Sequence, residues 1–373
     1  MSRRAAVFLA ATALATACNR GAPVAHVADS RAISLRDEAL RSARVWRPPA
    51  TPIARVDFAG NPAGPRALRP DDDLDCRFEL TRTSGTTPKF ECKLPDGDLV
   101  KIKYGGNNPE LHAEVAATRL LTALGFGADR MYVVRRVRCA GCPAFPFESL
   151  KCYDRTGLLA ACFAGPIDYG RSATFDPTVV ERHFDGRKIE TAENPGWAWY
   201  ELDRIDPAAG GSSRAEVDAL RLMAVFLSHW DNKAANQRLV CLPGGDRAGG
   251  GCTKPFAFVQ DLGATFGPVK LDLPNWRRTP VWADRATCTV SMKSLPYGGA
   301  TFPDRRISEA GRQMLTGLLE QLSSGQLTDL FTASRVIEYD EISAETRSAA
   351  PWVEAFRNKI RQIADGGPCP QAP

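Results

Sequence analysis

The stretch His229–Gln237, HWDNKAANQ, sets an aspartate, a lysine and an asparagine in a fixed order, with Asp231 and Asn236 five residues apart. Over the preceding residues 217–227, apolar side chains recur at intervals of three and four, which predicts a buried helix that ends near Ser228. The quoted stretch is therefore expected to be the loop that follows this helix.

Two strand-like runs, RLVCL and FAFVQDLG, follow the loop on either side of a glycine-rich hairpin, and the second delivers Asp261 to a tight turn. A proton-accepting aspartate, a lysine near the transferred phosphate, a metal-binding asparagine and a second aspartate together form a phosphoryl-transfer set. Taken singly, Asp231, Asn236 and Asp261 could cap a helix or build a turn. Their joint order, with Lys233 between them, is hard to obtain from turns and favours phosphoryl transfer.

The region after Asp75 alternates apolar and polar residues in CRFEL, KFECKL and LVKIKYG, which predicts three antiparallel strands joined by the turns TSGTT and PDGD. The first turn contains Ser84, Gly85 and Thr86, which are small and hydroxylic. Its backbone amides could approach a phosphate closely. An ordinary hairpin turn would have a similar sequence.

The third strand places Lys101 and Lys103 on one face, and residues 109–126 then show a helical apolar pattern with Glu114 in its first turns. A strand lysine paired with a helix glutamate beside a small-residue turn holds the phosphates of ATP in kinases. The alternatives are a solvated strand edge for the lysines and a surface position for Glu114.

These motifs resemble those of the protein-kinase-like fold. HWDNKAAN and QDLG resemble its HRDLKPEN and DFG signatures, and VKIK resembles VAIK. The resemblance implies an α+β, two-lobed kinase-like fold, with an antiparallel β-sheet N-lobe that has one main helix and a mostly helical C-lobe. It implies ATP or another nucleoside triphosphate with magnesium as cofactors. It assigns the following roles: Asp231 catalytic base, Lys233 γ-phosphate contact, Asn236 and Asp261 magnesium ligands, Lys103 and Glu114 the phosphate-binding pair.

The chain departs from a typical protein kinase in several ways. It has one glycine in place of G-x-G-x-x-G, a short interval from Lys103 to Glu114, Trp230 in place of arginine, and no A-P-E. These departures favour the atypical branch, similar to HipA-like or phosphoinositide kinases. Aminoglycoside and choline phosphotransferases share the H-x-D-x-x-x-x-N pattern, so the family within the fold stays open. The resemblance covers about residues 74–267, with the cysteine-rich region after Cys139 as an insertion.

The N-terminus carries the features of an export signal. A short basic start and an apolar run precede LATAC, whose Cys18 resembles the lipidated cysteine of a bacterial lipobox; a plain secretory signal is the alternative. Of eleven cysteines, ten remain without Cys18, an even number that indicates an oxidising compartment. Three pairs stand at hairpin spacing and could each close a local loop: Cys76 and Cys92, Cys152 and Cys162, Cys241 and Cys252. Cys139 and Cys142 form CAGC, which favours a structural bridge over a redox site, and Cys288 and Cys369 remain, so the full connectivity stays open.

The expected organisation is a signal peptide over 1–18, a tether over 19–70, an N-lobe with the cysteine-rich insertion over 71–206, and a helical C-lobe over 207–373. The net charge of +5 is spread along the chain without a basic block, so no nucleic-acid partner is expected. The expected partners are a nucleotide and an unknown acceptor. Contact with a membrane is expected only through a lipid on Cys18.

The places of three tryptophans and the activity itself stay open. Trp197 and Trp199 belong either to the core or to a stacking surface, and the segment that contains Trp276 is either a substrate contact or a solvated loop. ATP is scarce outside the bacterial cytoplasm. The chain is therefore an envelope kinase with another donor or a local supply of ATP, a nucleotide-binding pseudokinase, or a structural envelope lipoprotein.

Overall fold

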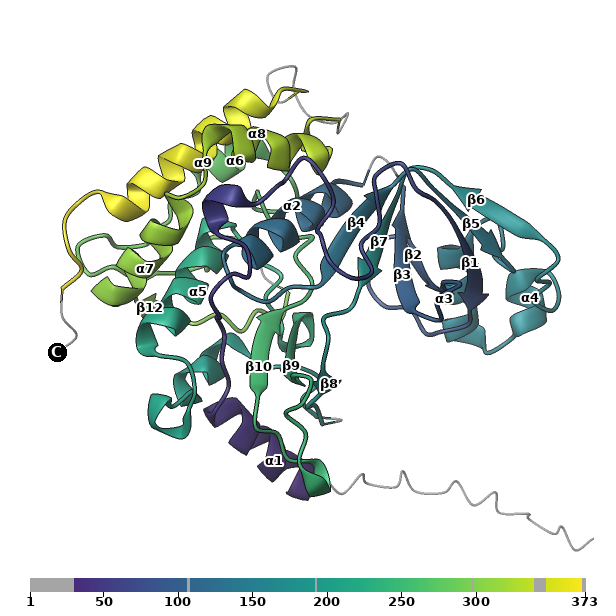
Figure 1. Ribbon diagram of the computed structural model, residues 1–373, viewed down its shortest axis with the longest axis horizontal. Helices are drawn as coiled ribbons and strands as arrows, with labels where there is room; N and C mark the ends of the chain where they lie inside the picture. The colour runs from purple at the N-terminus through teal and green to yellow at the C-terminus, as the bar shows by residue number, and fades with distance from the viewer. Residues whose placement is uncertain (1–29, 106–107, 192, 297, 339–346, 371–373) are drawn as a thin grey trace, which may run out of the picture.

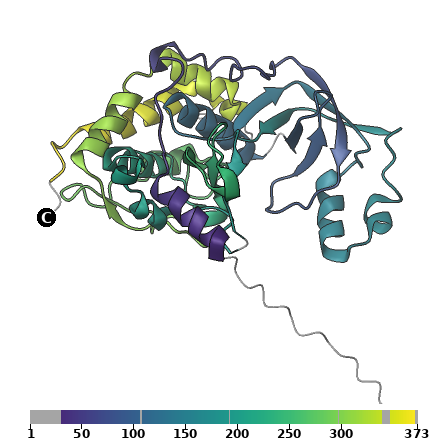
Figure 2. The ribbon, with the colours of Figure 1, turned by 60° about the horizontal axis from the view of Figure 1, so that its bottom comes forward.

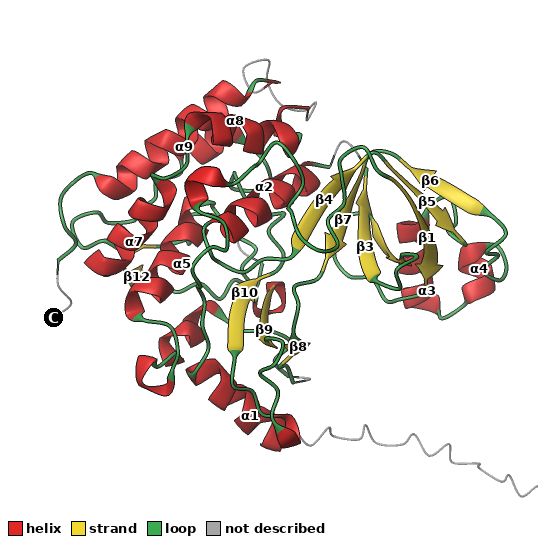
Figure 3. Ribbon diagram, in the orientation of Figure 1, coloured by secondary structure: helices red, strands yellow, loops and turns green. Residues whose placement is uncertain are grey.

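The computed structural model describes residues 30–370, except 106–107, 192, 297 and 339–346. The proposed lipid site Cys18 lies outside the described residues. Two lobes lie side by side, one built on a twisted sheet and one mostly helical (Figures 1 and 3). The expectation of an α+β, two-lobed kinase-like fold is confirmed.

The N-lobe sheet has seven strands in the described part of the chain, in the order β4-β7-β3-β2-β1-β5-β6. All neighbouring strands pair in antiparallel fashion except β1 and β5. Between β1 and β5 the chain passes through β2, β3, a helix and β4, and β5 follows β4 after a single residue. The strands are β1 Asp73–Glu79, β2 Lys89–Lys93, β3 Leu99–Tyr104, β4 Arg130–Val134, β5 Arg136–Ala140, β6 Ser172–Phe175 and β7 Thr178–Arg182.

The main helix of the N-lobe, α2, spans Pro109–Ala123 and begins at an Asn108 cap that accepts a hydrogen bond from Glu110 N. Proline at its first position suits the helix start. On the sheet side, Val115 packs with Met131 and other apolar residues of β4 and β7. The alanines and leucines of its other face join the large core of the C-lobe. The helix therefore links the two lobes.

The cysteine-rich insertion forms α3 (Pro146–Thr156) and α4 (Leu159–Phe163), which lie at the far end of the N-lobe (Figure 2). Leu150 of α3 is fully buried with Phe78 and Phe90 in a core cluster of the sheet. The insertion is thus part of the N-lobe core.

The C-lobe contains helices around a buried central helix, α5, and a small sheet in the order β10-β9-β8. Its helices are α1 Ser30–Arg41, α5 Arg214–Phe226, α6 Leu273–Arg278, α7 Glu309–Leu319, α8 Ser324–Ala333 and α9 Ala349–Ala364. Its strands are β8 Arg187–Lys188, β9 Gln237–Cys241, β10 Pro255–Val259, β11 Thr289–Val290 and β12 Arg305–Arg306. Short 3-10 helices span Ile53–Arg55, Trp199–Arg204, Pro207–Ala209, Ala234–Asn236, Ala248–Gly250 and Val336–Glu338. The helices expected near the C-terminus and before the HWDNKAAN loop are present.

The expected tether over 19–70 is wrong for its described part. Residues 30–70 contribute α1 and buried side chains such as Leu40, Val45 and Phe58 to the C-lobe core. Arg36 of α1 is also buried and forms an ion pair with Glu201 at 2.9 Å. The segment lacks a clear apolar period because only scattered residues reach the core.

The tryptophans in question all belong to the core. Trp197, Trp199 and Trp276 are fully buried, and Trp276 Nε1 donates to Phe226 O at 2.9 Å. A substrate-contacting role for Trp276 is therefore excluded. Because Trp197 and β8 pack into the C-lobe, that lobe begins before residue 207.

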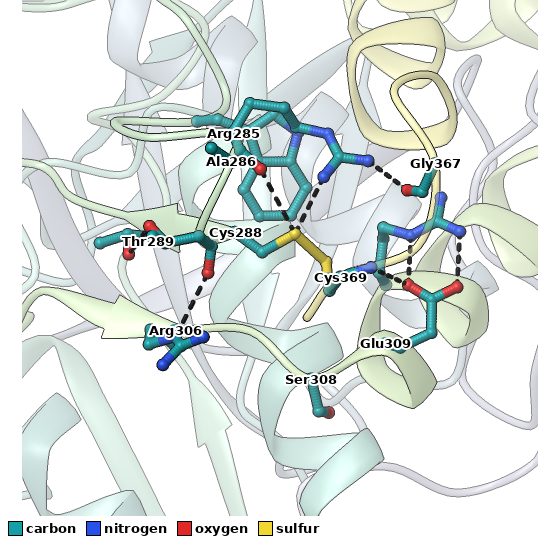
Figure 4. Close-up of a disulfide and its surroundings, with 12 residues drawn as sticks. Arg285, Ala286, Cys288, Thr289, Arg306, Ser308, Glu309, Gly367 and Cys369 are labelled. Carbon is teal, nitrogen blue, oxygen red and sulfur yellow. Dashed lines mark hydrogen bonds and ion pairs between the residues drawn. A yellow bond between two sulfur atoms is a disulfide. The ribbon is translucent and has the colours of Figure 1, made fainter. Parts of the chain in front are cut away.

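Five disulfides join all ten cysteines of the described residues: the three pairs at hairpin spacing, the bridge favoured for Cys139 and Cys142, and a fifth bridge between Cys288 and Cys369. Among these bridges the longest loop is closed by Cys288 and Cys369, which hold the segment after α9 against the segment before β11 (Figure 4). Arg285 and Glu309 reinforce this contact: Arg285 Nη2 donates to Gly367 O, and Glu309 Oε2 accepts from Cys369 N. Within the described residues, no helix has the length and apolar character needed to cross a membrane.

Candidate active site

The HWDNKAAN loop begins where α5 ends. Ser228 adopts a left-handed backbone conformation (φ 57°), and His229 N donates to Ala224 O at 2.9 Å, which closes the helix. The His229 ring is fully buried, and its nitrogens have no hydrogen-bond partner among the described residues. Burial lowers the pKa of His229 to about 4, so the ring is neutral at pH 7. His229 is therefore a neutral, fully buried side chain at the start of the loop.

The three polar residues of the loop contact one another. Lys233 Nζ lies 3.0 and 2.9 Å from the two carboxylate oxygens of Asp231. Asn236 Nδ2 donates to Asp231 O at 2.7 Å, which leaves the Asn236 side-chain oxygen available as a ligand. The side chains of Asp231 and Lys233 are 24% and 44% exposed, so both can meet a ligand.

Asp261 is tied to the same loop through the backbone. The amides of Gln260 and Asp261 donate to Asn236 O at 2.9 and 3.2 Å, so the two motifs that lie far apart in the sequence are held together. Burial would raise the pKa of Asp261, but the Lys103 and Lys89 ammonium groups outweigh it and hold the pKa below its usual value. Asp261 is therefore an ionised carboxylate.

The expected pair between Lys103 and Glu114 is formed, and both side chains are buried. A second carboxylate, Glu181 of β7, lies 2.8 Å from Lys103 and 2.5 Å from Lys101. Burial raises the pKa of Glu114 to about 7. The pKa of Glu181 is well below its usual value, because Lys101 and Lys103 outweigh its burial. Sequence reasoning missed Glu181; the charged residue inside the apolar run TVVER was the available signal.

Lys89 of β2 is a further cleft residue that sequence reasoning missed. It lies opposite Lys103 in the strand register, and a Cβ atom built on Gly85 would come within 3.2 Å of Lys89 Nζ. Within the part of the chain that the structure describes, Lys89 has no hydrogen-bond or ion-pair partner. Burial, Lys103 and Lys101 lower its pKa. Alternation in KFECK, which places Lys89 on the face of Glu91, was the available signal.

The TSGTT turn is the loop between β1 and β2, and its Gly85 lies next to Lys89. Ser84 lines the cleft, Gly85 has a φ of +76°, and Thr86 is exposed; Gly85 and Thr86 are not among the cleft-lining residues. The Thr87 hydroxyl donates to the Glu110 carboxylate at the start of α2. One side of the loop is thus anchored to the helix that carries Glu114.

The cleft between the lobes brings together five of the expected residues: Ser84, Lys103, Glu114, Asn236 and Asp261. Asp231 and Lys233 do not line it, but Asp231 is one hydrogen bond away through Asn236. The available ligand atoms of Asn236 and Asp261 are amide and carboxylate oxygens, which suit magnesium. The donor set therefore fits the expected metal.

Asn232, inside the HWDNKAAN loop, holds a distant segment. Its side-chain oxygen accepts from Thr301 N at 2.8 Å and Phe302 N at 3.0 Å, and Thr301 Oγ1 donates to Asn232 O at 2.8 Å. Asn232 is fully buried. Residues 301–302 are thereby fixed beside the loop that carries Asp231.

No protein-family model matches the sequence, and no curated protein matches it. Among solved structures, the chain is similar to the Helicobacter pylori proinflammatory kinase CtkA, with a TM-score of 0.39 and 10% identity over 79% of this chain and 95% of that one. It is also similar to the Golgi casein kinase (TM-score 0.34, 12% identity, 78% of this chain and 71% of that one). The same kinase with Mn/ADP bound gives a TM-score of 0.32 and 11% identity, over 78% and 72%. All three TM-scores lie below 0.5.

Proposed function

We propose that the protein is a magnesium-dependent phosphotransferase that transfers the terminal phosphate of a nucleoside triphosphate to an acceptor hydroxyl. The observation that carries this proposal is the backbone tie between Asn236 and Asp261, in one cleft with the paired Lys103 and Glu114. An aspartate that only built a turn, or a lysine that only lay on the surface, would not be expected beside the other polar groups of the cleft. The cleft instead gathers a metal-ligand pair and a phosphate-binding lysine.

Each residue has a defined part in the transfer. Lys103 and Lys89 bind the donor phosphates from the sheet, and the amides of the TSGTT loop close over them. Asp231 accepts the proton of the acceptor hydroxyl as its oxygen attacks the terminal phosphorus. Lys233, 2.9 Å from Asp231, balances the negative charge beside the attacking oxygen. Magnesium held by Asn236 and Asp261 supplies neutralisation of the donor phosphates when it is bound.

The five disulfides support a place outside the cytosol, because such bridges persist in oxidising compartments. We propose a cell-envelope location, with the chain exported and anchored by a lipid on Cys18. Mass analysis of the exported protein tests this: a lipid on Cys18 and no free thiols are expected. An unmodified N-terminus or an unprocessed signal would contradict the anchor.

Thermal unfolding combined with phosphate transfer tests the activity. A ligand at one hundred times its dissociation constant stabilises the folded state by about 2.7 kcal/mol. In a protein of this size that raises Tm by roughly 2 °C per kcal/mol. We expect ATP with magnesium to raise the Tm of the wild type, and Asp261→Asn to lose most of the magnesium-dependent part. Asp231→Asn should keep the shift and lose transfer.

The outcomes separate the three hypotheses. A shift in Tm without transfer in the wild type would identify a pseudokinase. No shift with any nucleotide and metal, in folded and fully disulfide-bonded protein, would defeat the proposed function and leave a structural lipoprotein. The matched control is Asp284→Asn, because Asp284 lies in an exposed turn outside the cleft and should change neither the shift nor the transfer.

A further inference from the structure

The cleft face of the N-lobe sheet carries charged side chains in successive rows. Lys89 and Lys103 are opposite each other in the register and form the row at the phosphate loop. Two residues further along, Glu91, Lys101 and Glu181 form the next row, in which Lys101 is the register partner of both acids. All five side chains line the cleft. The second row occupies the part of the sheet beyond the phosphates, where the base of a nucleotide would have to lie.

The C-lobe side of the cleft is also polar at this end. It is lined there by Lys188 and Arg238, and the cleft is also lined by His183, which directly follows β7 of the N-lobe. The Arg238 guanidinium is held by Glu190 and by the carbonyl oxygens of Ala235 and Gln237. A flat base therefore faces charged side chains on both walls.

Apolar surface is scarce around the cleft. Among the described residues that line it, Phe90, Leu150 and Ala235 are the apolar ones. Phe90 and Leu150 are at most 1% exposed and belong to the core cluster that also contains Val100 and Ile102, the strand residues that alternate with the cleft-facing lysines. They leave little surface on which a base could stack. A site that discriminates small molecules usually offers a mainly apolar wall with a few fixed polar groups.

Cations without hydrogen-bond or ion-pair partners add to the polar character of the cleft. Arg82 and Lys188 line the cleft, and neither has a hydrogen-bond or ion-pair partner within the described part of the chain. With Lys89, three cleft cations are thus free to meet negative charge. Long, exposed side chains such as those of Arg82 and Lys188 attract anions well but fix a base poorly, because ordering them costs rotamer entropy.

We infer that the cleft recognises its donor through the phosphate chain and not through the base, so that it accepts nucleoside triphosphates of any base and inorganic tripolyphosphate as well. This inference rests on the proposed function and specifies its donor class. The groups that suit a phosphate chain and a metal, from Lys103, Lys89, Asn236 and Asp261, lie at the phosphate end, and the far end offers charged side chains with little apolar surface.

The transfer balances with either donor. The acceptor oxygen forms a bond to the terminal phosphorus, the bridging P–O bond breaks, and the hydroxyl proton passes to Asp231. The leaving group is a nucleoside diphosphate from a nucleotide and diphosphate from tripolyphosphate. No other reactant is required, so a protein outside the cytoplasm would not depend on one particular nucleotide.

The test compares donors at a fixed concentration of free magnesium, since each donor chelates the metal. Binding is measured by the shift in Tm and transfer by the phosphate that reaches the protein or an added acceptor. We expect ATP, GTP, CTP, UTP and tripolyphosphate to have apparent affinities within about tenfold of one another, and adenosine without phosphates to produce no shift. A hundredfold preference for one base, or a shift with adenosine alone, would overturn the inference and leave the proposed function intact. No shift and no transfer with any of these donors would defeat both.

A variant at the far end of the cleft sharpens the comparison. Lys188→Ala should weaken every donor by the same factor, about two- to fivefold as for one exposed charge pair, and should leave the ratio between ATP and tripolyphosphate unchanged. Lys93→Ala is the matched control, because Lys93 is exposed on β2 and does not line the cleft. A loss confined to one nucleotide would show that Lys188 contacts its base and would contradict the inference.

Discussion

Replacing Lys103 by methionine tests the buried charge cluster and the donor site together. The change keeps the length of the side chain but leaves Glu114 without its cation, while Glu181 retains Lys101 at 2.5 Å. An isolated buried carboxylate takes up a proton instead of remaining charged. The unfolding free energy that the variant loses at Glu114 therefore cannot exceed the free energy of protonating this carboxylate. That free energy is about 1.4 kcal/mol for each pH unit above the unfolded pKa of Glu114, which is about 4.3.

This limit is about 4 kcal/mol at pH 7 and about 1 kcal/mol at pH 5. Because burial already raises the pKa of Glu114 to about 7 in the wild type, the observed loss should lie below the limit. The sign follows from linkage. In the variant, the folded state binds a proton at Glu114 that the unfolded state has released, so stability relative to the wild type falls as the pH rises. Lys103→Met should thus be nearly as stable as the wild type at pH 5 and less stable at pH 8.

The double variant Lys103→Met with Glu114→Gln separates stability from function. The neutral amide needs no cation, so most of the loss at pH 8 should be regained. The stabilisation by ATP with magnesium should stay absent in both variants, because the phosphates have lost Lys103. Urea or thermal unfolding at the two pH values, with and without donor, is the assay. An equal loss at pH 5 and pH 8, or a single variant that keeps its response to the donor, would refute the reasoning.

Two further predictions concern buried polar residues. Asn232→Ala removes the side-chain acceptor of two hydrogen bonds from residues 301–302, so we expect a loss of about 2 kcal/mol and a larger defect in acceptor use than in donor binding, measured as separate KM values. Lys359 is fully buried, donates to Thr279 O at 2.7 Å, and has its pKa lowered to about 7 by burial. Its unfolded state binds more protons between pH 7 and 10, so wild-type stability should rise with pH there, and Lys359→Met should flatten this rise in unfolding curves.

The parts of the site that could be predicted from sequence are those that depend on local order. Residues 229–236 follow the end of a helix directly, and the spacing within the loop alone places Asp231 and Asn236. The pair between Lys103 and Glu114 was also predictable, because a strand followed at once by a helix leaves few arrangements. In the same way, the hairpin spacing of three cysteine pairs indicated which cysteines bond to each other.

The parts that could not be predicted depend on contacts between distant segments. Glu181 enters the site because β7 inserts between β3 and β4, a neighbour relation that no local pattern encodes. Apolar residues in the segment 30–70 do not recur at the intervals of a helix or a strand. Leu40 and Phe58 are nevertheless buried, in a core cluster formed with helices much later in the chain. Trp276 carries flanking arginines typical of a surface loop, but it fills the core beneath α5.

The short interval between Lys103 and Glu114, which departs from typical kinases, has a structural consequence. β3 ends at Tyr104 and α2 begins at Pro109, so Glu114 is only one and a half turns into the helix when it meets the lysine. Both side chains are therefore deeply buried, and burial raises the pKa of Glu114. A lysine that relied on this partner alone would lose its counter-ion as Glu114 takes up a proton. Glu181 removes this weakness, because two lysines hold its pKa well below the usual value and keep it charged. Lys103 thus retains an ionised partner across the neutral range, and its position beneath the donor phosphates does not depend on the protonation of Glu114.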